Sequence, residues 1–324
     1  MKTKILSLCG ALALLAGAAA CGSSEAGSND PNKINVGSFP GTIYTYPLGV
    51  AETKGFFTDE GLDVTLIDGK SGPEILSAMI GGSTQVTFGQ PGVIVPAGAQ
   101  GQELKVLGPY SRGRVVMVAT EESGITTLDQ LPGKRFAVPQ RGDSNEQRTL
   151  SVLEEYGIDG TAITFIGTGS PATTAAAIAN GQADASVLGL TTYESLLAKG
   201  TKLRIIAGST EGTMGERGKN DVTGMFATTK QFWDTNPDAI GKFCRAMKSS
   251  IEWIADDANS DEATRILVAW TGLSEDTARG VWESERDTFT MDLSEQLWNA
   301  NVSYVDPKID PKYNDIVTNG CPSS

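Results

Sequence analysis

Three prolines stand where a helix would begin directly after an apolar segment. They are Pro73, Pro91 and Pro171, preceded by Gly72, Gln90 and Ser170. Proline is favoured in the first helical turn, where its missing N–H would have no partner in any case. Such a turn presents unpaired backbone N–H groups and the positive end of the helix dipole, which together attract anions. If the three helix starts converge, the sequence predicts an anion-binding site, although every α/β protein contains helix ends of this kind.

Aromatic and polar side chains follow the predicted strands as well. The aromatic ones, in the loop after the first strand, can stack on a ring or enclose an alkyl chain, or can pack beneath the loop. Arg112 and Arg141 are suited to bidentate pairing with an acidic ligand, or to solvation at the surface. The candidate ligand-binding residues are Phe39, Tyr44, Thr45, Tyr46, Ser71, Gly72, Gln90, Arg112, Gln140, Arg141, Ser144, Thr168, Gly169, Ser170, Leu190 and Thr191.

The composition excludes several kinds of function. Lysine and arginine number 26 against 39 acidic residues, which gives a formal net charge of −13. This charge argues against nucleic acid as a partner, because phosphates require clustered basic residues. The sequence contains no histidine, the commonest general base and metal ligand. We therefore predict no catalytic residue, no cofactor and no metal site, although carboxylates alone can also bind a cation.

The N-terminus has the form of an export signal. Lys2 and Lys4 precede a short apolar run that ends at Cys21. The run is too short for a transmembrane helix, and its small residues before the cysteine resemble a bacterial lipobox. We expect residues 1–20 to be a signal peptide and Cys21 to carry a lipid, so that the protein is extracytoplasmic and contacts the membrane through this lipid only. The alternative is an ordinary signal peptide cleaved near Ala20.

Two cysteines, Cys244 and Cys321, remain in the exported chain. In an oxidising compartment they can form a disulfide that fixes the C-terminal tail to a helix. The alternative is a buried free thiol at Cys244.

Beyond a flexible tether at 21–33, short apolar runs alternate with amphipathic segments, which predicts α/β architecture. Predicted strands cover 34–38, 63–67, 85–89, 104–108, 115–120, 135–138, 162–166, 185–188, 203–207 and 222–228. Predicted helices cover 47–60, 73–81, 91–100, 144–156, 171–180, 191–199, 261–271, 274–285 and 293–300, with another beginning at Asn236-Pro237. We expect one lobe at 34–112 with 224–324, a second at 113–223, and crossings near 110–118 and 209–224.

Two short sequences are similar to phosphate-binding loops of enzymes. Gly69-Lys70-Ser71 lacks the earlier glycine of such a loop, since position 64 is Val64. Residues 167–172 (GTGSPA) match a dinucleotide-binding fingerprint between a predicted strand and helix. This match lies in the middle of an exported chain, where nicotinamide cofactors are scarce. We interpret it as another anion-facing helix start and predict that the protein is not an enzyme.

Four segments resemble one family of binding proteins. They are LGVAETKGFFTDEGLDV at 48–64, the small-residue segment at 82–90, TLDQLPGKRFAV at 127–138 and NGQADA at 180–185. In this order and spacing they resemble the nitrate/sulfonate/taurine and thiamine-precursor binding proteins. The resemblance implies a two-lobe periplasmic-binding-protein fold of type II with a ligand cleft between the lobes. It also implies no catalysis, ligand contacts from the loop after the first strand, and an ABC permease with its ATPase as partners.

The ligand class follows less directly. The aromatic loop favours a molecule larger than nitrate, and the helix starts with Arg112 favour an organic anion, a sulfonate or carboxylate that can carry a ring. The alternatives are a thiamine-precursor pyrimidine or other nitrogen heterocycle, and a ligand-sensing lipoprotein without a transport role. We expect a monomer.

Overall fold

The computed structural model describes residues 30–305, 308–309 and 311–319. The predicted signal peptide, Cys21 and Cys321 lie outside the described residues. From Pro31 onward the chain forms one compact unit. No helix in the described part of the chain combines the length and apolar character needed to cross a bilayer.

The first sheet has six strands in the order β11-β4-β10-β3-β1-β2. β1 pairs in parallel with β2 and β3, whereas β10 and β11 run antiparallel to their neighbours. Its strands are β1 (Lys33–Ser38), β2 (Asp63–Asp68), β3 (Val86–Gly89), β4 (Leu104–Ser111), β10 (Gly224–Thr229) and β11 (Phe289–Thr290).

The second sheet has five strands in the order β7-β6-β8-β5-β9. β6 pairs in parallel with β7 and β8, and β5 runs antiparallel to β8 and β9. Its strands are β5 (Val115–Thr120), β6 (Arg135–Val138), β7 (Thr164–Gly167), β8 (Ala185–Gly189) and β9 (Leu203–Gly208).

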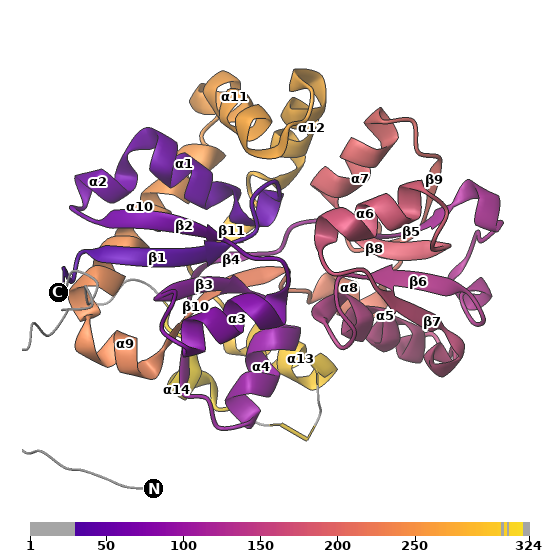
Figure 1. Cartoon of the computed structure of the whole chain (residues 1–324), viewed down its shortest axis with the longest axis horizontal. Helices are drawn as coiled ribbons and strands as arrows, with labels where there is room; N and C mark the ends of the chain where they lie inside the picture. The colour runs from indigo at the N-terminus through magenta and orange to yellow at the C-terminus, as the bar shows by residue number, and fades with distance from the viewer. Residues whose placement is uncertain (1–29, 306–307, 310, 320–324) are drawn as a thin grey trace, which may run out of the picture. The chain divides into compact units, whose positions relative to one another are not determined.

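Helices cover both faces of each sheet (Figure 1). The helices of the first lobe are α1 (Tyr46–Lys54), α2 (Phe56–Asp59), α3 (Gly72–Ile80), α4 (Pro91–Ala99), α9 (Lys230–Thr235), α10 (Pro237–Ala255), α11 (Ser260–Thr271), α12 (Glu275–Glu285), α13 (Glu295–Val305) and α14 (Tyr313–Ile316). Those of the second lobe are α5 (Ser144–Glu155), α6 (Pro171–Ala179), α7 (Leu190–Ala198) and α8 (Gly215–Lys219). α1 and α10 lie on the opposite face of the first sheet from α3 and α4.

The core of the second lobe shows why its strands are continuous apolar runs. Val115 and Met117 of β5 pack into one hydrophobic cluster with α5, whereas Val116 and Val118 pack into another with α6 and α7. Successive side chains of a strand point to opposite faces, so a strand covered on both faces must be apolar throughout. All six residues of β5 are buried accordingly.

The chain passes between the two sheets twice, after β4 and after β9. The two crossing segments bind each other at both ends. The Ser111 and Thr223 hydroxyl oxygens are 3.0 Å apart, and the Val115 N–H donates to Ser209 Oγ at 3.1 Å. The type II fold with two crossings predicted from the sequence is therefore confirmed.

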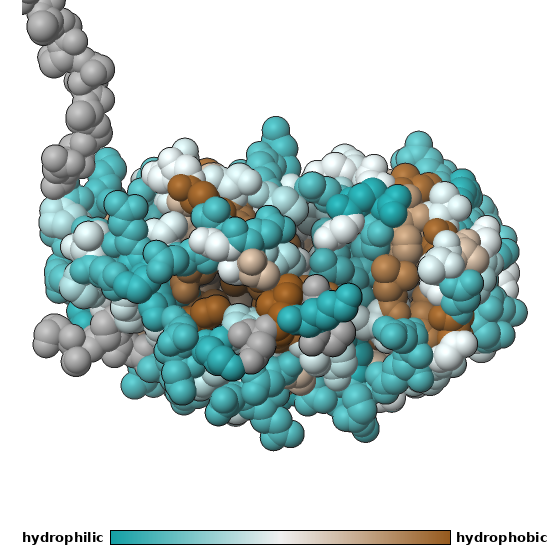
Figure 2. Space-filling model, turned by 90° about the horizontal axis from the view of Figure 1, so that it is seen from below, coloured by the Kyte–Doolittle hydropathy of each residue, from teal (hydrophilic) through white to brown (hydrophobic). Residues whose placement is uncertain are grey.

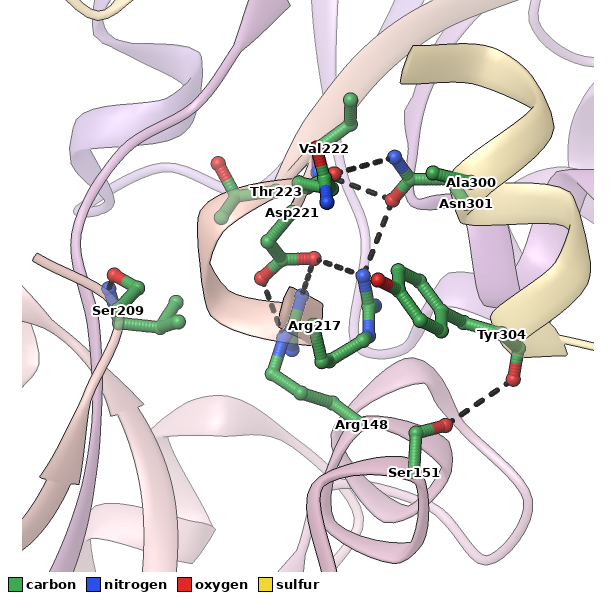
Figure 3. A network of polar contacts seen from close by, with 12 residues as sticks. Arg148, Ser151, Ser209, Arg217, Asp221, Val222, Thr223, Ala300, Asn301 and Tyr304 are labelled. Carbon is green, nitrogen blue, oxygen red and sulfur yellow. Dashed lines mark hydrogen bonds and ion pairs between the residues drawn. The ribbon is translucent and has the colours of Figure 1, made fainter. Parts of the chain in front are cut away.

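A buried ion cluster holds the second crossing segment (Figure 3). Asp221 accepts from Arg148 Nε at 2.7 Å and lies 2.8 Å from Arg217 Nη1. Arg217 also donates to Asn301 Oδ1 on α13 and lies over the ring of Tyr304. All three charged side chains are at most 5% exposed. Two arginines and one aspartate give the cluster a net positive charge.

The predicted helices and strands agree with the structure apart from five features. The helix predicted at 47–60 is divided at Gly55, which has the left-handed φ of 78°. Short helices α8, α9 and α14 and the two-residue strand β11 were not predicted. They are too short to give a periodic pattern, and β11 exists through pairing with β4.

The surface seen from below is mainly hydrophilic, and hydrophobic residues show mostly in recesses (Figure 2). This surface agrees with the strongly acidic composition.

The buried cluster predicts a large loss of stability on removing its carboxylate. In Asp221→Ala, Arg148 and Arg217 stay buried without their counter-charge, so the free energy of unfolding falls by about 3–5 kcal/mol. Urea unfolding measures the change. As a control, Asp234→Ala breaks the exposed pair with Lys230 and costs about 0–1 kcal/mol. Equal effects of the two substitutions would contradict the assigned role of the cluster.

Candidate functional site

A cavity of about 110 Å³ lies between the two sheets. Both lobes contribute to it, mostly through residues at strand ends and in first helical turns. The lining residues are Phe39, Thr42, Tyr44, Ser71, Gly72, Phe88, Gly89, Gln90, Val93, Val115, Pro139, Asp143, Asn145, Pro171, Thr174, Val187, Leu188, Gly189, Thr191 and Thr192. A mostly apolar wall with a few polar groups is typical of small-molecule sites.

The N-termini of five helices meet at this cavity. Its wall includes the N-cap residues of α3, α4, α5 and α7, which are Ser71, Gln90, Asp143 and Gly189, and Pro171 at the start of α6. The convergence follows from the fold, because helices that leave the carboxyl ends of the strands begin at the crevice between the sheets. Each end favours a nearby anion by about 0.3–1 kcal/mol.

Aromatic side chains form the wall on the side of the first lobe. The rings of Phe39 and Phe88 meet edge to face with centroids 6.1 Å apart. Tyr44 bridges the lobes, because its hydroxyl donates to the Arg114 carbonyl oxygen at 3.3 Å in the first crossing segment. Burial, and then the nearby carboxylate of Glu285, raises the pKa of Tyr44, so the phenol stays protonated. These rings can enclose the apolar part of a ligand.

Asp143 is the charged side chain of the cavity wall, and within the described residues no lysine or arginine belongs to that wall. Its Oδ1 accepts the backbone N–H groups of Asn145 and Glu146, both at 3.0 Å, as the N-cap of α5. Burial raises the pKa of Asp143 to about 6, against the lowering effect of these bonds and of Arg148. The carboxylate is therefore directed at its own helix and partly neutralised by it.

Arg148 supplies positive charge behind the wall rather than in it. It lies on α5 in the buried cluster with Asp221, and its Nη1 donates to Asn145 Oδ1 at 2.9 Å. Asn145 in turn lines the cavity. Counted together, Asp143 and Asp221 balance the charges of Arg148 and Arg217, so the helix dipoles rather than a net charge make this wall favourable to an anion.

The lobes touch beside the cavity through glycines. The Gly92 carbonyl of α4 accepts from Gln147 Nε2 of α5 at 3.3 Å. A Cβ atom at Gly92 would lie 2.7 Å from Ser144 Oγ, and one at Gly189 would lie 2.5 Å from the Tyr44 hydroxyl. Residue 92 must therefore lack a side chain for α4 and α5 to approach each other as closely as they do.

A second buried carboxylate lies at the crossing. Both oxygens of Glu285, at the end of α12, accept the backbone N–H of Arg114, at 3.0 and 3.1 Å. Burial raises the pKa of Glu285 to about 7, although the bond to Arg114 lowers it. The crossing segment is thus fixed by a group that titrates near neutral pH.

Six of the predicted ligand-binding residues line the cavity. They are Phe39, Tyr44, Ser71, Gly72, Gln90 and Thr191. Their contact with a ligand stays a prediction.

The other predicted residues lie behind or beside the wall. Tyr46 is buried and donates to the Ala263 carbonyl oxygen at 2.7 Å, and Thr45 donates to that of Phe39. The two arginines are engaged elsewhere: Arg112 donates to the Lys219 carbonyl oxygen, and Arg141 forms a bidentate pair with Glu146. Ser144 is buried, Leu190 packs in a core cluster, Ser170 caps α6, and Thr168 bonds to Thr174. Gln140 and Gly169 are also absent from the cavity wall.

Several wall residues were not predicted as ligand contacts, among them Thr42, Phe88, Pro139, Asp143, Asn145, Thr174 and Thr192. Most of these positions gave a usable signal, since they lie at the start of a helix or next to a residue that was predicted, whereas Phe88 lies within β3.

Cys244 is disulfide-bonded. Because Cys321 lies outside the described residues, its pairing with Cys244 stays a prediction.

Two α/β lobes, two crossings and an intervening cavity define a periplasmic-binding-protein fold. Solved structures with this arrangement include a protein of Bordetella bronchiseptica RB50, with a TM-score of 0.76 at 23% identity over 89% of this chain and 95% of the other. The alkanesulfonate-binding protein SsuA from Xanthomonas axonopodis pv. citri, bound to MOPS, gives a TM-score of 0.74 at 20% identity over 89% and 99%.

Sequence relatives identify the family. A Bacillus subtilis (strain 168) protein named as a binding protein, YtlA, is 26% identical over 256 residues, which cover 78% of this chain and 74% of YtlA. The family described as NMT1/THI5 like matches residues 42–260, more than half of the chain. The chain belongs to this NMT1/THI5-like family, and the family resemblance predicted from the sequence motifs is confirmed.

The glycine contact predicts that Gly92→Ala prevents full closure. The added methyl group would meet the α5 backbone at Ser144 Cα, 3.0 Å away, so α4 and α5 must move apart at this point. We expect a larger radius of gyration by small-angle X-ray scattering than for the wild type. Gly98→Ala, also on α4 but with no atom within 4 Å of the new Cβ, should leave it unchanged. An unchanged radius for Gly92→Ala would contradict the assigned contact.

The raised pKa of Glu285 predicts a loss of stability as pH rises. The folded protein holds this proton more tightly than the unfolded chain, in which the pKa is near 4.5. The resulting stabilisation is full below about pH 4.5 and is lost as pH rises through about 7. Urea unfolding from pH 5 to pH 8 should show a smaller decline for Glu285→Gln than for the wild type. The exposed neighbour Glu283→Gln should follow the wild type, and identical slopes in all three would refute the assignment.

Proposed function

We propose that this protein is an extracytoplasmic solute-binding protein that captures a small organic anion and delivers it to an ABC importer. The convergence of five helix N-termini on an aromatic-walled cavity is the observation that carries this proposal. The anion is a sulfonate or a carboxylate, and it can carry a ring.

The electrostatics of the cavity support an anion. The starts of α4 and α7 have no side-chain cap, so their backbone N–H groups can form charge-assisted hydrogen bonds with a sulfonate or carboxylate group, whereas Ser71, Asp143 and Ser170 cap the other three helices. The cluster of Arg148, Arg217 and Asp221 has one excess positive charge behind α5, which offsets the carboxylate of Asp143. Recognition by backbone groups removes the need for a lysine or arginine in the wall.

The shape of the cavity supports an organic molecule. Phe39, Tyr44 and Phe88 offer an apolar surface that a nitrate ion would leave uncovered. SsuA from Xanthomonas axonopodis, which has the same fold, is an alkanesulfonate-binding protein bound to MOPS. A charged head at the helix ends and an apolar body against the rings would satisfy both halves of the cavity.

The partners follow from the class of protein. We propose that the protein acts as a monomer, that an ABC permease with its ATPase receives the solute, and that a lipid on Cys21 anchors it outside the cell membrane. We further propose that residues 34–112 and 224–324 form the first lobe and residues 113–223 the second. The two lobes close around the solute by a hinge motion, and the protein catalyses no reaction.

One observation favours a second ligand class. Asp143 places a carboxylate in a wall without a basic side chain, and a carboxylate can accept N–H groups from an aminopyrimidine or other nitrogen heterocycle. The two classes make opposite demands on this residue.

Thermal unfolding of the chain from Gly22 onward, against sulfonates, aromatic acids, nitrate and pyrimidines, tests the proposal. A ligand at 100 times its Kd should stabilise the protein by about 2.7 kcal/mol and raise the Tm. We expect the shift with an organic sulfonate or carboxylate. A shift with pyrimidines alone would replace the proposed ligand, and no shift with any compound would contradict the binding function.

Asp143→Asn separates the two classes, because asparagine also caps a helix but carries no charge. We expect anion affinity to be kept or increased, whereas pyrimidine affinity would fall. Asp159→Asn, at another helix cap that is exposed and remote from the cavity, is the matched control.

A further inference from the structure

Asn145 places a side-chain amide at the cavity wall. It lies in the first turn of α5 and is half-buried, and its Oδ1 accepts a hydrogen bond from Arg148 Nη1 at 2.9 Å. Its Nδ2 donates to no other residue in the described part of the chain. One end of the amide is therefore engaged inside the protein, whereas the other end is available to a ligand.

Arg148 determines which end faces the cavity. A guanidinium group carries only donors, so it can bond to the oxygen of an amide but not to the nitrogen. Reversing the amide would bring donors of Asn145 and Arg148 together. Arg148 cannot turn away, because it is 1% exposed and its Nε and Nη2 donate to Asp221 at 2.7 and 3.3 Å.

We propose that Asn145 is a specificity-determining residue whose amide NH₂ donates a hydrogen bond to the bound solute, and that Arg148 is the residue that positions it. This inference rests on the proposed function and adds a requirement to it. The solute must present an acceptor atom, such as a sulfonate, carboxylate or carbonyl oxygen, at Asn145. A solute with an N–H donor at that point loses the bond and leaves two donors opposed.

The same contacts connect the solute to the second crossing segment. Asp221, which holds Arg148, lies in that segment, and Asn301 of α13 fixes the residues on either side of it (Figure 3). Asn301 accepts the Val222 N–H at 3.1 Å and donates to the Asn220 carbonyl oxygen at 2.7 Å. A solute bound to Asn145 therefore stabilises the arrangement of α5 against the crossing that closure requires.

Binding of benzenesulfonate, measured by calorimetry, tests the donor role. Asn145→Ala removes the donor and should weaken binding about 10-fold, the usual value of a hydrogen bond to a charged group. Asn145→Asp replaces the donor with a negative charge and should weaken it about 100-fold or more. Asn180→Asp, which adds the same charge at an exposed position away from the cavity, should bind like the wild type. Wild-type affinity in Asn145→Ala would overturn the proposal.

Arg148→Lys tests the positioning role. Lysine keeps the charge but lacks the planar guanidinium group that binds Asp221 and Asn145 at the same time. Affinity for benzenesulfonate should therefore fall. If Arg148 acts through Asn145, the same substitution should change affinity much less in the Asn145→Ala background. Equal losses in the two backgrounds would show a merely structural role for Arg148.

If benzenesulfonate does not bind, that result counts against the proposed ligand class alone. The orientation of the Asn145 amide can still be tested without a ligand, by comparing the stability of two variants. A carboxylate at position 145 still accepts from Arg148, whereas alanine does not. Asn145→Asp should therefore resist urea at least as well as Asn145→Ala. A lower urea midpoint for Asn145→Asp would show that the amide oxygen does not face Arg148 and would overturn the inference.

Discussion

Asp221 is shared by two arginines that lie in the second lobe, and it belongs to the segment through which the chain returns to the first lobe. The three charges are buried, so each depends on the others for the solvation that water no longer provides. This shared carboxylate fixes the depth and direction of α5 relative to the crossing. The cavity depends on that placement, since Asp143 and Asn145 occupy the start of the same helix.

The remaining features of the site follow from parallel strand pairing. When a helix leaves the carboxyl end of a strand, its first N–H groups point toward the sheet edge. Two sheets that face each other across a crevice therefore bring several positive helix ends together without any basic side chain. The protein adds aromatic rings on one side of the crevice and, behind the other side, a buried cluster in which Arg148 and Arg217 share Asp221.

Local signals in the sequence were sufficient for most of the fold and for part of the site. Ser71, Gln90 and Thr191 were predicted because a strand end or helix start can be recognised from adjacent residues. Arg148 and Arg141 show the limit. Both lie near the start of α5, and only the fold reveals that Arg141 is exposed and pairs with Glu146, whereas Arg148 is buried against Asp221, 73 residues away. No periodicity in a single sequence records a pairing at that separation.

The contact between α4 and α5 has a consequence for the conformational equilibrium of the empty protein. Ser144 Oγ and Gln147 Oε1 are buried there, and neither has a hydrogen-bond partner among the described residues. Each buried polar atom without a partner raises the free energy of this arrangement by about 1–3 kcal/mol, because the atom could bond to water if the lobes were apart. Since about 1.4 kcal/mol changes a population tenfold, these two atoms weigh against the arrangement in which α4 and α5 touch, whereas the bond from Gln147 to Gly92 favours it.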